Sequence, residues 1–163
     1  MIVEIQGASI VGHIDIEAPP EMVFDAFTDP EQLTAWWGSA DTYWTFNWKV
    51  DLRPGGSYSC NARSTSGGDT STVKGTYIQV DRPHTLIYTW SPSWDASAET
   101  EVRLKFEKIA SGTRLHIVHS GFAGREQSQQ GHTQGWTRVL GWLRDHVQQD
   151  STAKPQDPHS RKS

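Results

Sequence analysis

The segment GWTRVLGWLRDHV (residues 135–147) decides the fold, because it carries the longest apolar helix face in the chain. Its apolar side chains follow the i, i+3, i+4, i+7 spacing of a helix buried on one side. They are Trp136, Val139, Leu140, Leu143 and Val147. The pattern predicts one helix over 131–147, inside a helical run from about Arg125 to Gln149. Weak helix formers and two glycines in EQSQQGHTQG (126–135) leave the start of that helix open.

A helix face of this length needs a sheet to cover it, and the preceding sequence supplies one. TEVRLKFEKI (100–109) alternates between apolar and charged residues, which is typical of a strand with one buried face. Similar strand patterns occur in residues 9–17, 43–52, 57–64, 73–80, 85–90 and 113–122. Short turns such as Arg53–Gly56 join most of them, so the strands should pair antiparallel.

Two short helices are predicted between the first strand and the rest of the sheet. EMVFDAFTD (21–29) follows two prolines, and EQLTAWW (31–37) follows Asp29–Pro30. The order of elements therefore predicts an α+β fold, with an antiparallel sheet of about six or seven strands curled around a long C-terminal helix. We expect a single domain over 1–149 and a disordered tail over 150–163, because that tail is polar.

Composition and charge exclude several classes of partner. The chain carries 15 basic and 19 acidic residues, a net charge of −4, and lacks the basic surface that nucleic acid or an anionic membrane requires. Cys60 is the one cysteine, so neither an intrachain disulfide nor a cysteine zinc site is expected. We find no signal peptide and no apolar run of membrane-spanning length, and we expect a cytoplasmic protein.

Several segments together resemble a known family. They are FDAFTDPEQLTAWWG (24–38), DLRPGGSY (51–58), GTYIQVDRPHTLIYTW (75–90), GTRLHIVHSGF (112–122) and GWTRVLGWL (135–143). Over residues 9–147 the chain resembles the START-like (SRPBCC, birch-pollen-allergen-like) superfamily, in the branch of homologues of the activator of the heat-shock-protein-ninety ATPase. The resemblance implies the helix-grip fold. It leaves lipid or hormone binding, polyketide cyclisation and stress-related chaperone contact as alternatives.

Residues on the inner faces of this fold are the candidates for lining a cavity between sheet and helix. They are Trp36, Trp37, Tyr58, Tyr88, Trp90, His119 and Trp136. Trp36 and Trp37 are adjacent, so we expect one to pack in the core and the other to face the cavity. Trp136 is more typical of the core, and core packing is an equal alternative for the strand aromatics. We expect Cys60 to be a small buried apolar side chain.

His119 has two interpretations. It shares a strand face with Leu115 and Ile117, where an imidazole could bind a ligand or act as a general acid or base. Alternatively, it is a structural histidine, bonded to backbone at the end of the last strand, and this interpretation is favoured. The sequence contains no nucleophile elbow, phosphate loop or zinc-protease motif.

The sequence thus predicts a binding protein for a small apolar or aromatic molecule, with no cofactor and no metal. The alternatives are a cyclase or hydrolase that uses His119, and a stress-associated partner of a chaperone. Nothing in the sequence fixes the oligomeric state.

Overall fold

The fold is one antiparallel sheet wrapped around one long helix, and the computed structural model describes residues 1–95 and 99–152 of it. The elements in chain order are β1 (Ile2–Gln6), β2 (Ser9–Ile16), α1 (Pro20–Ala26), α2 (Pro30–Trp36), β3 (Tyr43–Val50), β4 (Ser57–Ser64), β5 (Ser71–Asp81), β6 (Thr85–Pro92), the 3-10 turn η1 (Ser93–Asp95), β7 (Thr100–Ile109), β8 (Gly112–Ser120) and α3 (Glu126–Thr152). The strands form a single sheet in the order β1-β2-β8-β7-β6-β5-β4-β3. The helix-grip fold predicted from the sequence is therefore confirmed.

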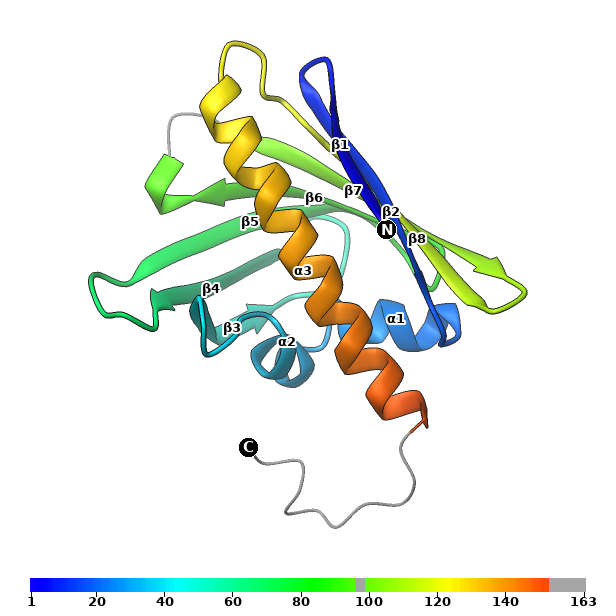
Figure 1. The fold of residues 1–163 in the computed structure, drawn as a ribbon. Helices are drawn as coiled ribbons and strands as arrows, with labels where there is room; N and C mark the ends of the chain where they lie inside the picture. Colours follow the sequence, from blue (N-terminus) through cyan, green and yellow to red (C-terminus); the bar gives the residue numbers. More distant parts are fainter. Residues whose placement is uncertain (96–98, 153–163) are drawn as a thin grey trace.

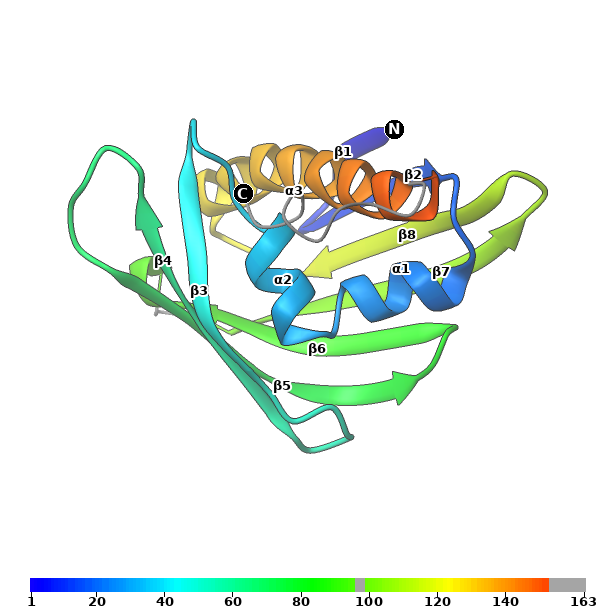
Figure 2. The same cartoon turned by 90° about the horizontal axis from the view of Figure 1, so that it is seen from below.

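The sheet curves so that α3 lies on its concave side (Figure 1). Viewed from below, β3 and β4 turn up beside the N-terminal half of α3, and α2 lies next to β3, with α1 following it between α3 and the sheet (Figure 2). The predicted helix face is buried throughout, with Leu140 and Leu143 at 0% exposure. Because the sheet curls around the helix at one end and packs flat on it at the other, the two ends differ in how completely they are filled.

The structure has one strand more than the sequence predicted, and it is β1. This edge strand pairs with β2 through a turn at Gly7, whose φ is +59°. Ile2 and Ile5 are exposed, so the burial of β1 does not alternate. Without alternation on a buried face, the period-2 signal for a strand is missing.

A β-bulge in β3 changes which side chains face the helix. The pairing of β3 with β4 shifts register between Phe46 and Lys49, and Asn47 has a φ of +56°. Thr45 faces inward before the bulge, and after it Trp48 faces inward instead of Asn47. A strict alternation would have placed Trp48 outside with Phe46, so the bulge brings an indole into the interior.

The two predicted short helices are also present, and each begins at a proline. Asp29 caps α2 by accepting a hydrogen bond from the backbone N–H of Glu31 at 3.1 Å. At the other end of the chain, α3 continues to Thr152, three residues past the boundary predicted at 149. The rest of the predicted disordered tail, residues 153–163, lies outside the described residues.

Candidate functional site

A cavity of about 810 Å³ opens between the N-terminal half of α3 and strands β3 to β6, and we call it the outer cavity. Five of the chain's eight tryptophans line it. They are Trp37, Trp48, Trp90, Trp94 and Trp136. On the helix side the wall contains Gly131 and Gly135, where an added Cβ would meet nothing within 4 Å. On the sheet side, aromatic and small apolar side chains share the lining with polar ones such as Thr45, Arg63 and Ser71.

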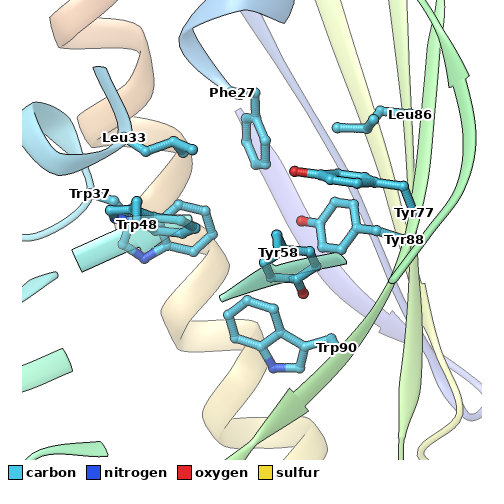
Figure 3. Close-up of a pocket in the computed structure, with 9 residues that line it drawn as sticks. All are labelled: Phe27, Leu33, Trp37, Trp48, Tyr58, Tyr77, Leu86, Tyr88 and Trp90. Atoms are coloured by element: carbon cyan, nitrogen blue, oxygen red, sulfur yellow. The ribbon is translucent and has the colours of Figure 1, made fainter. Parts of the chain in front are cut away.

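A second, much smaller cavity of about 20 Å³ lies deeper, and we call it the inner chamber. Its walls are Phe27, Leu33, Leu86 and three tyrosines, together with Trp37, Trp48 and Trp90 (Figure 3). Those three tryptophans line both spaces, so they form the partition between them. Trp37 and Trp90 lie nearly parallel, at 16° with ring centroids 6.0 Å apart.

Hydrogen bonds from the three partition indoles fix how the rings lie. Trp37 Nε1 donates to the Tyr43 hydroxyl at 3.3 Å, and Trp48 Nε1 donates to Thr45 Oγ1 at 3.0 Å. Trp90 Nε1 donates to His132 Nε2 on α3 at 3.1 Å. All three indole N–H groups are thus committed to protein partners, and the partition presents mainly ring faces and edges to the two spaces.

His132 and His119 each hold one indole in place. Since an indole N–H can only donate, the histidine nitrogen that it meets must accept. His132 therefore accepts from Trp90 at Nε2, while its Nδ1 donates to the Ser128 carbonyl at 2.9 Å. Burial lowers the pKa of His132 from its ordinary value, which keeps the ring neutral as this arrangement requires.

His119 is sealed on both sides. Its Nδ1 accepts from Trp136 Nε1 at 3.0 Å, and its Nε2 lies 2.7 Å from Thr100 Oγ1. Burial, with smaller contributions from His132 and Arg125, lowers the pKa of His119 to about 3. With both nitrogens occupied and no tendency to protonate near neutrality, the ring acts as a brace between strands and helix. Its partners are side chains, whereas the sequence had suggested backbone groups.

The walls of both spaces are electrically neutral where they are deepest. Burial raises the pKa of the Cys60 thiol to about 12, and it raises the pKa of Tyr58, Tyr77 and Tyr88 above the usual phenol value. Charged side chains occur only in the lining of the outer cavity, at Arg63, Asp69, Asp95 and Arg138, and Asp95 accepts hydrogen bonds from Arg125 and Ser128. The arrangement suits a ligand with an apolar body and a few polar groups.

Six of the seven residues selected from the sequence line one or both spaces. Trp37 and Trp90 line both, Tyr58 and Tyr88 line the inner chamber, and His119 and Trp136 line the outer cavity. Trp36 lines neither: it is 3% exposed, packs in the core and donates from Nε1 to the Ala26 carbonyl at 2.8 Å. Both adjacent tryptophans are buried, Trp37 at 7% exposure, and of the two only Trp37 is among the residues that line the cavities.

Sequence reasoning missed Trp48, His132 and the two helix glycines. A signal for the glycines existed, since Gly131 and Gly135 are four residues apart and share one helix face with Ser128 and His132. Within residues 1–95 and 99–152, no group of three or more His, Cys, Asp or Glu side chains could hold a metal ion. In the same part of the chain, no helix combines the length and apolar character needed to cross a membrane.

Known structures share this fold. An AHSA1-like protein of Aeromonas hydrophila aligns with a TM-score of 0.71 and 23% identity, over 93% of this chain and 99% of its own. An AHSA1 protein of Silicibacter pomeroyi aligns with a TM-score of 0.75 and 23% identity, over 88% and 99%. A protein of Chromobacterium violaceum gives a TM-score of 0.76 and 24% identity, over 86% and 98%. At these identities the likeness shows the fold alone.

Sequence comparison gives the family. An uncharacterized protein of Schizosaccharomyces pombe is 24% identical over 131 residues, which cover 79% of this chain but only 34% of that protein. The chain thus spans about a third of the length of this relative. The model of the family described as activator of Hsp90 ATPase homolog 1-like protein matches residues 17–148, from the end of β2 almost to the end of α3. The chain belongs to this family, in the START-like superfamily that the sequence resembles.

Proposed function

We propose that this protein binds a small apolar or aromatic molecule in the outer cavity. The observation that carries the proposal is a space of about 810 Å³ between α3 and the sheet, lined by five tryptophans. That volume is within the range of about 300–1,000 Å³ typical of small-molecule sites. Five indole rings beside a set of polar side chains favour a ligand with an apolar or aromatic body.

The helix glycines support the same proposal. Each glycine in a helix interior costs about 0.8–1 kcal/mol relative to alanine. Gly131 and Gly135 both line the outer cavity, and neither is required by a close backbone contact, because a Cβ would meet nothing within 4 Å. Because these two residues have no side chain, the helix leaves more of the outer cavity empty at these positions.

Catalysis by His119, the second interpretation from the sequence, has less support. A general base must reach the proton that it abstracts. Here Thr100 and Trp136 occupy both ring nitrogens, and the pKa of His119 is lowered to about 3. Binding without chemistry at this residue is the function that the geometry favours.

The test is a fluorescence titration with a variant that fills the cavity. Tryptophan emission should change saturably on addition of members of a panel of fatty acids, flavonoids and aromatic acids, because indoles line the site. Gly135→Leu should place a side chain in the outer cavity and weaken binding at least about tenfold, a loss of about 1.4 kcal/mol. No saturable change with any member of the panel would contradict the proposal.

A matched control is available on the same helix. Gly141 also has no atom within 4 Å of an added Cβ, and it does not line the outer cavity. Gly141→Leu makes the same substitution away from the site and should leave affinity unchanged. Equal affinities for the two variants would show that the ligand binds elsewhere.

A further inference from the structure

The inner chamber contains a buried hydroxyl group that has no hydrogen-bond partner among the residues that the structure describes. Tyr88 is 4% exposed, and its hydroxyl oxygen has no hydrogen-bond partner among the described residues. Figure 3 shows the hydroxyl pointing away from β6 into the space below Phe27. A buried polar group without a partner destabilises a fold by about 1–3 kcal/mol, so its retention calls for an explanation.

The other polar groups of the chamber make no hydrogen bond to Tyr88. The indole N–H groups of Trp37, Trp48 and Trp90 already donate to Tyr43, Thr45 and His132. Tyr58 donates its hydroxyl to the Thr89 carbonyl at 2.6 Å. The Tyr77 hydroxyl points into the same space beside that of Tyr88 (Figure 3), and no hydrogen bond joins the two. Two phenols thus converge on one small space.

Chemistry narrows what could fill this space. Burial raises the pKa of Tyr77 and Tyr88, so both phenols keep their protons and can donate. The lining residues of the chamber include no charged side chain, which disfavours an anion or a cation. A carbonyl oxygen has two lone pairs and no proton, so it can accept from both phenols at once.

Size and connection agree with that chemistry. A volume of about 20 Å³ admits one group the size of a water molecule, for which about 10–15 Å³ is enough. The chamber adjoins the outer cavity across the partition of Trp37, Trp48 and Trp90. A ligand body resting on these indoles could therefore extend a single oxygen atom into the chamber.

We propose that the inner chamber is a recognition site for a neutral carbonyl oxygen, and that Tyr88 is the residue that binds it. The ligand class is a flat apolar ketone or ester whose ring system occupies the outer cavity. This inference rests on the proposed function, since it specifies the molecule that the outer cavity takes. It assigns Tyr88 a binding role and Tyr77 a supporting one.

The test compares two probes that differ in one oxygen, 2-acetylnaphthalene and 2-ethylnaphthalene, by quenching of tryptophan fluorescence. Wild-type protein should bind the ketone about three- to tenfold more tightly, as expected for one net hydrogen bond. Tyr88→Phe should lose this preference and keep its affinity for 2-ethylnaphthalene. It should also melt no lower than wild type, because it removes a hydroxyl that has no partner.

The outcomes separate this inference from the proposed function. If both probes bind wild type equally, or if Tyr88→Phe keeps the preference, the carbonyl site is wrong while the binding function stands. If neither probe binds and the wider panel also fails, both proposals fail. If the panel binds but neither naphthalene does, the carbonyl inference alone is overturned.

A spectroscopic measurement keeps the inference testable should Tyr88→Phe fold poorly. The infrared C=O stretch of 2-acetylnaphthalene, labelled with ¹³C at the carbonyl, should move to lower wavenumber on binding wild-type protein, relative to the probe in hexane. A stretch at the hexane position in the bound state would show that no donor reaches the oxygen and would overturn the proposal.

Discussion

The two halves of α3 face opposite kinds of surroundings. In the C-terminal half, Leu140, Leu143 and Val147 are at most 1% exposed and belong to the hydrophobic core of aliphatic and aromatic side chains. In the N-terminal half, glycines and polar residues face a cavity walled by indoles. One helix thus completes the core with one half and leaves space with the other. Stability and binding are therefore separable along a single element, and substitutions in each half should affect different properties.

The largest expected effect is the loss of a core side chain from the packed half. Leu140→Ala should lower the free energy of unfolding by about 2–5 kcal/mol, through lost burial and the cavity left behind. Urea unfolding monitored by circular dichroism measures it. Val139→Ala, one residue away in the wall of the outer cavity, should lose less than half as much, because that side chain already borders open space. Similar losses in the two variants would contradict the division of the helix.

The next effect concerns His119, which accepts a hydrogen bond from Trp136 in the N-terminal half of α3. At neutral pH, His119→Gln should lower the free energy of unfolding by about 1–3 kcal/mol, because Trp136 Nε1 loses its imidazole acceptor. Acid should separate the two proteins further. Unfolded histidine binds a proton below about pH 6.5, whereas folded His119 resists protonation down to a pKa of about 3.

This difference in the number of bound protons determines whether acid raises or lowers the free energy of unfolding. As pH falls from about 6 toward 3, the unfolded state binds a proton that the folded state refuses, so wild-type stability decreases by up to about 1.4 kcal/mol per pH unit from this residue. His119→Gln lacks this contribution and should show a shallower decline. Urea unfolding at pH 7 and pH 4.5 gives both slopes, and parallel slopes would mean that His119 is protonated in the folded protein.

The smallest effect tests the bulge that builds the cavity side of the sheet. Asn47 has a φ of +56°, a conformation that a β-branched residue adopts only with strain. Asn47→Val should cost about 1–2 kcal/mol, and Asn47→Gly, which suits this φ, should be close to neutral. The difference in emission between each variant with Trp48 and the same variant with Trp48→Phe reports whether this indole stays inside. A valine variant as stable as the glycine variant would mean that the bulge is not held at this position.

The sequence predicted most of the fold because its signals were local and periodic. Alternation in β7 and helical spacing in α3 each follow from one buried face, and both elements occur where expected. The edge strand β1 was not predicted, because Ile2 and Ile5 are exposed and its sequence therefore shows no alternation between buried and exposed residues. A sequence pattern therefore identifies a helix or strand only where one face of that element is buried along its length.

The candidate site was predictable in part for the same reason. Strand parity identified Tyr58, Tyr88 and Trp90, and the division between Trp36 and Trp37 followed from their adjacency. Trp48 was missed because one left-handed residue reversed the parity of β3. The partners of His119 were missed because Thr100 and Trp136 come from a neighbouring strand and a helix, a pairing that only the folded register provides.

The reactivity of the Cys60 thiol can be used as a probe of the outer cavity. It is the one sulfhydryl in the chain, it lines the outer cavity, and its pKa is raised from 9.0 to about 12. Three pKa units correspond to about a thousandfold less thiolate at neutral pH, and only the thiolate reacts rapidly with alkylating reagents. Labelling at Cys60 should therefore be slow, and because the thiol lines the outer cavity, a ligand bound there should slow it further.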